Sequence, residues 1–132
     1  MRVLILVTGY PRWKGDFNNV YLHRLAKSLI MKKIETHVIT PHSQDLKKEE
    51  IMEGVYIHRF QYFPEKFQTL AYFPGIPEKI KTVKGKIQLP FFMLNMTQKM
   101  ISVIRKYSID LINAHWAIPS GFLATCTKIF HK

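Results

Sequence analysis

The 132-residue sequence has a single cysteine, few acidic residues and no long apolar run, and each shortage narrows its interpretation. Cys126 has no partner for an internal disulfide, which favours a reducing compartment. No segment approaches the roughly 18–20 consecutive apolar residues of a membrane-spanning helix. The opening run Val3–Val7 is too short for a signal-peptide core and is broken at once by Gly9 and Pro11. We therefore expect a cytoplasmic protein.

The shortage of acidic residues leaves a strongly basic chain. Nine Asp and Glu stand against 20 Lys and Arg, for a formal net charge of +11. Such a balance favours partners that carry phosphate, namely nucleic acid, anionic lipid or nucleotide-linked substrates. The lysines are scattered and form no single tract, which is also typical of an ordinary solvated surface. Charge alone leaves both interpretations open.

The pattern of apolar residues predicts strands that alternate with helices. The length suits one domain, covering 1–132, and 47% of the residues are hydrophobic. This order is typical of an α/β fold with a doubly wound, mainly parallel Rossmann-like sheet and flanking helices. The expected elements are strands at Arg2–Val7, Thr36–Thr40, Val55–Phe60 and Ile109–Ile112, a polar loop at His42–Glu50, a hairpin turn at Glu53-Gly54, and helices at Phe17–Lys33, Pro90–Lys106 and Pro119–Phe130.

The segment around His115 is the strongest candidate for a functional site. Ile109–Ile112 is a short apolar run with β-branched residues, the pattern of a strand covered on both faces. Pro119 and Ser120 suit the first turn of a following helix. In an open α/β sheet, ligands bind beyond the carboxyl ends of the strands. We therefore expect His115 and Trp116 to stand in such a crevice.

A second candidate is the loop after the first strand. Gly15 lies before an expected helix with Asp16 as its N-cap, where backbone N–H groups and the helix dipole favour an anion. The loop lacks the glycine spacing of dinucleotide-binding and P-loop motifs, so an ordinary strand-to-helix turn is an open alternative. The same lack disfavours a nicotinamide-dependent oxidoreductase.

The remaining histidines and aromatic residues have simpler interpretations. His23 falls on an expected helix, and His37 and His58 fall within strands, where packing or surface roles are expected. No pair has metal-ligand spacing, so we predict no metal site. An aromatic stretch could form a flap toward lipid or acceptor, or could cover the sheet edge; it comprises Phe60, Tyr62, Phe63, Phe67, Tyr72 and Phe73.

Four segments in order carry a resemblance to a known family. They are Tyr10–Val20, Leu25–Leu29 followed by Glu35–Pro41, Glu53–Phe60, and Asp110–Gly121, of which the last matches best. Together they resemble the N-terminal domain of a family 4-type glycosyltransferase of GT-B architecture. The resemblance covers nearly the whole chain except Lys79–Gln88.

The resemblance implies a retaining transfer of a sugar from a nucleotide-sugar donor to a saccharide or lipid-linked acceptor, as in cell-envelope polysaccharide synthesis. It implies no cofactor besides the donor. In such enzymes two Rossmann-like halves face each other, and the N-terminal half mainly binds the acceptor. Residues 1–132 would then be that half, incomplete at its C-terminus and lacking the C-terminal donor domain with its paired glutamates. Because positioning supplies much of the rate, we expect this chain alone to be inactive.

The resemblance also assigns roles to individual residues. His115 would be catalytic, beside the transferring sugar, where it orients a hydroxyl or stabilises developing charge. Gly15 and Asp16 would line the cleft near the donor phosphates or the acceptor, although Asp16 replaces the family's second loop glycine. The other substrate-binding positions would be Asn19, Trp116 and Ser120.

A different class of function remains as the alternative. On charge alone, the chain could be a basic Rossmann-like module that binds anionic membrane or nucleic acid without catalysis. Steep salt dependence of DNA binding would favour the nucleic-acid version, which we do not expect. Peripheral contact with the inner face of a membrane is compatible with either class, because a transferase can use a lipid-linked acceptor.

Overall fold

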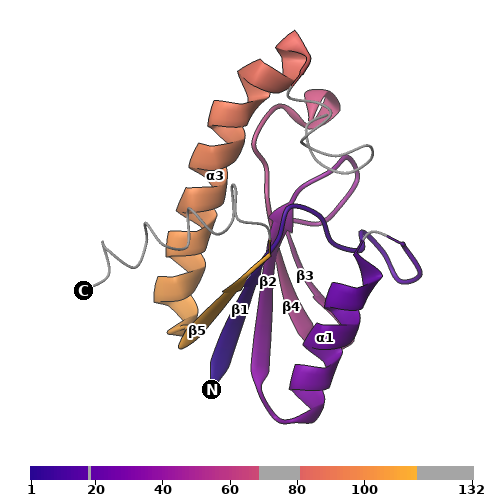
Figure 1. Cartoon of the computed structure of the whole chain (residues 1–132), viewed down its shortest axis with the longest axis vertical. Helices are drawn as coiled ribbons and strands as arrows, with labels where there is room; N and C mark the ends of the chain where they lie inside the picture. Colours follow the sequence, from indigo (N-terminus) through magenta and orange to yellow (C-terminus); the bar gives the residue numbers. More distant parts are fainter. Residues whose placement is uncertain (18, 69–80, 116–132) are drawn as a thin grey trace.

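The computed structural model describes residues 1–17, 19–68 and 81–115 of the chain. Its strands and long helices follow each other in the predicted order, with one helix after the first strand and another before the last described strand (Figure 1). In chain order the elements are β1 (Arg2–Leu6), α1 (Val20–Met31), β2 (Glu35–Pro41), β3 (Glu49–Met52), β4 (Val55–Phe60), the short 3-10 helix η1 (Glu65–Phe67), α3 (Val83–Tyr107) and β5 (Leu111–Ala114).

The strands form one five-stranded sheet in the order β3-β4-β2-β1-β5. β1 pairs in parallel with β2 and with β5, and β2 pairs in parallel with β4. β3 is antiparallel to β4, and the turn between them contains Glu53 and Gly54, both with positive φ. Two consecutive positive-φ residues are typical of a tight hairpin turn. The expected doubly wound, mainly parallel sheet and its hairpin are confirmed.

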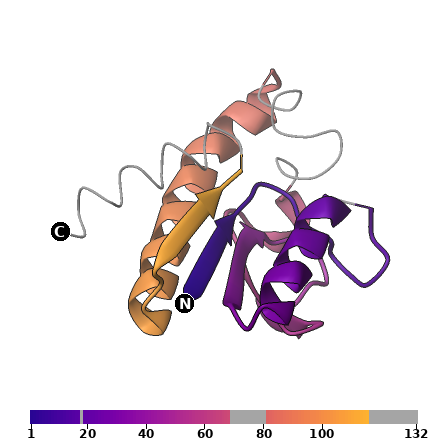
Figure 2. The same cartoon turned by 60° about the horizontal axis from the view of Figure 1, so that its bottom comes forward.

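The two long helices cover opposite faces of the sheet (Figures 1 and 2). α1 joins β1 to β2, and α3 follows β4 and leads into β5. Along β1, Val3 and Ile5 contribute to one core cluster, and Leu4 and Leu6 contribute to the other. The alternation of side chains along a strand thus supplies apolar residues to both layers of the core.

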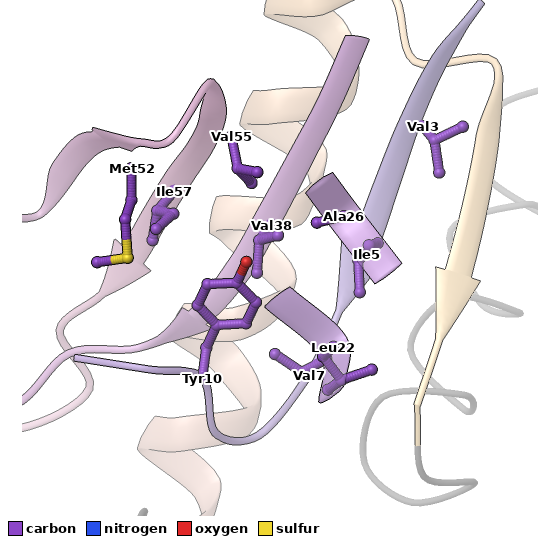
Figure 3. Close-up of a cluster of buried hydrophobic side chains, with 10 residues drawn as sticks. All are labelled: Val3, Ile5, Val7, Tyr10, Leu22, Ala26, Val38, Met52, Val55 and Ile57. Atoms are coloured by element: carbon purple, nitrogen blue, oxygen red, sulfur yellow. The ribbon is translucent and has the colours of Figure 1, made fainter. Parts of the chain in front are cut away.

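The core beneath α1 consists of apolar side chains from α1 and from the strands, together with the ring of Tyr10 (Figure 3). Leu22 and Ala26 of α1 are fully buried against Val38 of β2 and Val55 of β4. Tyr10, from the loop after β1, is also fully buried there. The loop that leaves β1 is therefore anchored in the core.

The core beneath α3 is aromatic at one end and rich in methionine along the helix. Phe92 of α3 packs edge-on against Phe60 and Tyr62, with ring centroids 5.1 and 5.0 Å apart. Met96 and Met100 continue the buried face of the helix. Phe60 and Tyr62 of the aromatic stretch are thus core residues, and Tyr72 and Phe73 lie outside the described residues.

The first helix begins later than predicted. α1 starts at Val20, not Phe17, and its N-cap position is Asn19, which has φ 49° and makes no side-chain cap bond. Asp16 is not the N-cap because its carboxylate instead accepts hydrogen bonds from Arg12 within the loop. The predicted capping role of Asp16 is therefore wrong.

The long helix begins earlier than predicted. α3 starts at Val83, where the hydroxyl of Thr82 accepts a hydrogen bond from the Gly85 N–H, and it contains Pro90 in its interior. The prediction placed Pro90 at the helix start, where proline is common. Pro90 is exposed, so the helix accommodates the lost backbone hydrogen bond on its outer side.

The last described strand lies at an edge of the sheet. β5 spans Leu111–Ala114, displaced from the predicted Ile109–Ile112, and Leu111 is 53% exposed. The other three residues of β5 are only partly buried, so the prediction of a strand buried on both faces is wrong. Among the described strands, β5 pairs only with β1. At the other edge, β3 begins at Glu49, inside the predicted loop His42–Glu50. The predicted helix at Pro119–Phe130 lies outside the described residues.

Candidate functional site

The candidate site lies where the carboxyl ends of β1 and β5 meet. From β1 the chain passes through α1 to β2 on one side, and it later returns through α3 to β5 on the other side. In this architecture ligands usually bind at the carboxyl edge of the sheet, where the strand order reverses. His115 directly follows β5, and its backbone N–H donates to the Leu6 carbonyl at 2.9 Å. The sheet therefore places His115 beside the end of β1.

The imidazole of His115 has an unsatisfied atom. Its Nε2 is buried and has no hydrogen-bond partner among the residues that the structure describes. Burial also lowers the pKa of this histidine, which favours the neutral ring near pH 7. A buried polar atom without a partner costs free energy. A substrate hydroxyl that reached this atom could form the missing hydrogen bond, because Nε2 donates or accepts according to the tautomer.

The loop between β1 and α1 is closed on itself by Asp16. This carboxylate accepts from the backbone N–H of Arg12 at 2.9 Å and from its Nε at 2.8 Å. The Arg12 guanidinium also lies 4.5 Å from the ring centroid of Trp13, which is exposed. The same loop thus carries Arg12, the exposed Trp13 and Gly15, which has no side chain and a φ of 96°.

Arg59 ties this loop to the neighbouring strands. Its side chain is 1% exposed and donates to the carbonyl of Lys47 at 3.0 Å and to the Glu50 carboxylate at 2.6 Å. It also reaches the carbonyl of Arg12 at 3.3 Å. No motif in the sequence points to Arg59. Its only signal is a charged residue within the apolar strand Val55–Phe60.

Asn19 braces the base of the same loop. Its side-chain Nδ2 donates to the carbonyl of Gly9 at 2.8 Å, and a Cβ added at Gly9 would lie only 3.3 Å from that nitrogen. The close approach explains a glycine at position 9. In this structure the Asn19 amide is therefore engaged in shaping the loop.

A hydrogen-bond relay, buried at Tyr10 and His23 and exposed at Glu53, fixes α1 against the loop and the hairpin. Tyr10 shares a 2.5 Å hydrogen bond with Nδ1 of His23, and Nε2 of His23 lies 2.6 Å from the Glu53 carboxylate. A neutral His23 can accept from the hydroxyl and donate to the carboxylate at once. Burial raises the pKa of Tyr10, so it stays a hydroxyl. His23 thus has the packing role that its sequence position predicts.

A second relay crosses the opposite face of the sheet. His37 lies 2.7 Å from Glu35 and 3.0 Å from His58, which in turn contacts Glu49. Lys99 of α3 completes the relay on Glu49. His37 and His58 lie within their strands, so this relay links β2, β4, β3 and α3 and serves packing, as predicted. Among residues 1–17, 19–68 and 81–115, no three His, Cys, Asp or Glu side chains are grouped to hold a metal ion.

The predicted site residues come from two segments, the loop between β1 and α1 and the chain that follows β5. His115 stands beside the point where the first loop begins. In Figures 1 and 2 that loop runs outward past the start of α1. Gly15 and Asp16 belong to this loop, since β1 ends at Leu6 and α1 begins at Val20. Trp116 and Ser120 lie outside the described residues.

Comparison with known proteins gives the chain a family. A family model described as glycosyl transferase 4-like matches residues 14–131. A solved structure of sucrose-phosphate synthase from Thermosynechococcus elongatus superimposes with a TM-score of 0.62 at 18% identity, covering 97% of this chain and 30% of that one. A second structure of that protein gives 0.64 at 16% identity, covering 98% and 58%. No curated protein matches the sequence.

These comparisons agree with the α/β fold of the chain. At such identities the structural likeness establishes the fold, and this chain spans only part of the length of the two chains that it resembles. The family match is independent of them and covers nearly the whole sequence, including the first loop from residue 14 and the segment after β5. The chain therefore belongs to the glycosyl transferase 4-like family.

Proposed function

We propose that residues 1–132 are the acceptor-side domain of a retaining glycosyltransferase of GT-B architecture. The complete protein would transfer a hexose from a nucleotide-sugar to a saccharide or lipid-linked acceptor, such as a growing cell-envelope polysaccharide. The observation that carries the proposal is His115, a strand-end histidine at the switch point of the sheet, whose buried Nε2 has no partner within residues 1–17, 19–68 and 81–115. Membership of the glycosyl transferase 4-like family supports it.

In this proposal His115 hydrogen-bonds a hydroxyl of the sugar being transferred. The bond between the anomeric carbon and the donor phosphate oxygen breaks, a bond to the acceptor oxygen forms, and the acceptor proton leaves with the nucleotide product. A neutral imidazole fixes the sugar without adding a positive charge beside the developing oxocarbenium ion. The lowered pKa of His115 fits this role.

The first loop would bind the charged part of a substrate. The backbone N–H groups near Gly15 and the guanidinium of Arg12 suit a phosphate. Asp16 would act by holding Arg12, because its carboxylate already accepts two hydrogen bonds from that residue. Asn19 would set the position of the loop through Gly9. Trp116 and Ser120 remain proposed walls of the substrate site.

The proposal assigns the rest of the machinery to a donor domain outside this chain, which faces the carboxyl edge in the complete protein. We propose that the isolated chain is inactive for lack of that domain, and that no cofactor besides the nucleotide-sugar takes part. A cytoplasmic location, with peripheral contact at the inner face of a membrane, fits a lipid-linked acceptor. Within the part of the chain that the structure describes, no helix has the length and hydrophobicity to cross a bilayer.

The test is sugar transfer by the complete protein, with panels of sugar nucleotides, carrying His115→Ala. We expect kcat to fall at least ~100-fold while the melting temperature stays nearly constant. Leu111→Ala, an exposed residue on the same strand, serves as the control and should retain activity. Unchanged turnover in His115→Ala would remove the proposed role. Sugar transfer by residues 1–132 alone, at the rate of the complete protein, would contradict the proposal that a separate donor domain is required.

A further inference from the structure

α3 has two apolar faces, and only one of them is buried. The inner face packs on the sheet through Phe92, Met96 and Met100. The outer face carries a second stripe at helical spacing, with exposed fractions of 73, 53, 48 and 55%; in order its residues are Val83, Ile87, Phe91 and Leu94. Large apolar side chains that line up outside the core mark an interaction surface more often than scattered ones do.

The charged side chains of α3 are all positive. α3 contains no acidic residue in its 25 positions. Lys84 and Lys86 are exposed beside the stripe, and Lys81 directly precedes the N-cap residue Thr82. A helix with an apolar stripe flanked by lysines is typical of segments that lie in the interface of an anionic bilayer. The cores of protein interfaces are instead depleted in lysine.

The stripe lies at the same end of the molecule as the candidate site. α3 runs antiparallel to the parallel strands, and its first turns project beyond the carboxyl edge of the sheet (Figure 1). His115 is at that edge, beside the end of β1. A surface that held the first turns of α3 would therefore lie near the edge where a substrate is expected.

We propose that the outer face of the first turns of α3 docks on an anionic phospholipid bilayer. Val83, Ile87, Phe91 and Leu94 enter the boundary between headgroups and acyl chains, and the flanking lysines contact lipid phosphates. Apolar burial and lysine attraction act together in such binding. The inference deepens the proposed function, on which its link to a lipid-linked acceptor rests.

The experiment is flotation of the chain with vesicles of phosphatidylcholine alone or with about 30% phosphatidylglycerol. No sugar nucleotide is present, so a failure of lipid binding is distinguishable from a failure of the transferase proposal. We expect binding to the anionic vesicles, at least ~10-fold weaker binding to the neutral ones, and loss of binding as salt is raised.

Two pairs of substitutions test the two components. Ile87→Gln with Phe91→Gln removes the apolar stripe, and Lys84→Glu with Lys86→Glu reverses the charge. Acidic residues are favourable at the start of a helix, so the second pair should not unfold α3. Each pair should weaken binding to anionic vesicles at least ~10-fold. The matched controls are Ile51→Gln, which is exposed on β3, and Lys32→Glu with Lys48→Glu, both exposed elsewhere; they should bind as the parent does.

Three results would overturn the inference. The first is a parent chain that does not float with anionic vesicles. The second is binding that the control substitutions weaken as much as the α3 substitutions do, which would indicate diffuse charge attraction. The third is a parent dimer in gel filtration that the α3 substitutions dissociate while vesicle binding is unchanged, which would assign the stripe to a second copy of the chain.

Discussion

Arg59 donates a hydrogen bond to the backbone carbonyl of Arg12, 47 residues earlier in the chain. Through this contact the β3–β4 hairpin supports the loop that leaves β1, because the same guanidinium also bonds Lys47 and Glu50. The loop that would bind substrate is thus fixed by a buried charged side chain and does not depend on its own residues alone.

We predict that Arg59→Met lowers the free energy of unfolding by about 2–4 kcal/mol. The substitution keeps the length of the side chain but leaves the Glu50 carboxylate and two carbonyls without their donor. Urea denaturation measures the effect. Arg24→Met, at an exposed position on α1, is the control and should change stability by less than about 0.5 kcal/mol. Equal losses in the two variants would show that the Arg59 contacts contribute nothing specific.

We predict that Tyr10→Phe costs about 1–2 kcal/mol of stability. The hydroxyl is the partner of Nδ1 of the buried His23, and its removal leaves that nitrogen unsatisfied. Tyr21→Phe removes a hydroxyl from a tyrosine that is 55% exposed and should be neutral within about 0.5 kcal/mol. Thermal and urea unfolding of both variants separate the two cases. If Tyr10→Phe leaves the free energy of unfolding unchanged, the hydrogen bond between Tyr10 and His23 does not stabilise the fold.

We predict that stability falls in mild acid through Glu35 and Glu53. The hydrogen bond from His37 holds the pKa of Glu35 below its usual 4.5, and the hydrogen bond from His23 does the same for Glu53. Because the folded pKa values are lower than those of the unfolded chain, this stability is fully present above about pH 4.5 and is lost as pH falls through the folded values.

Urea denaturation between about pH 6 and about pH 3 measures this dependence. The double variant Glu35→Gln with Glu53→Gln should be less stable near neutral pH and should show a flatter profile below about pH 5. If the parent and the double variant lose stability with the same slope, other carboxylates carry the acid sensitivity.

We predict that Pro90→Ala raises the free energy of unfolding by about 1–2 kcal/mol. Proline in the interior of α3 removes one backbone hydrogen bond and is the poorest helix former, while alanine is the best. Position 90 is exposed, so the change creates no core cavity. Gln98→Ala, also exposed on α3, should have an effect below about 0.5 kcal/mol. A loss of stability in Pro90→Ala would show that the fold requires proline at this point.

Local sequence signals predicted the elements but placed some of their ends wrongly. The apolar run after Arg2 and the turn at Glu53-Gly54 are short-range features, and the structure confirms both. The N-cap predicted at Asp16 and the helix start predicted at Pro90 are wrong because each residue type is common in two structural settings. Aspartate caps helices or closes loops, and proline starts helices or interrupts them. The side chain of Arg12, which bonds Asp16, lies four residues before it. Helix-capping rules consider the residues that follow a cap, so they do not include this partner.

The sequence by itself determined the alternation of strands and helices, the family, and the position of His115 at the end of a strand, because these depend on neighbours along the chain. Only the tertiary structure decided which strands are neighbours, that β5 lies at an edge, and that His115 stands beside the end of β1. It also decided that a buried Arg59 holds the first loop. These features come from contacts between segments that are distant in sequence, and the free energy of such contacts appears only once the sheet has brought them together.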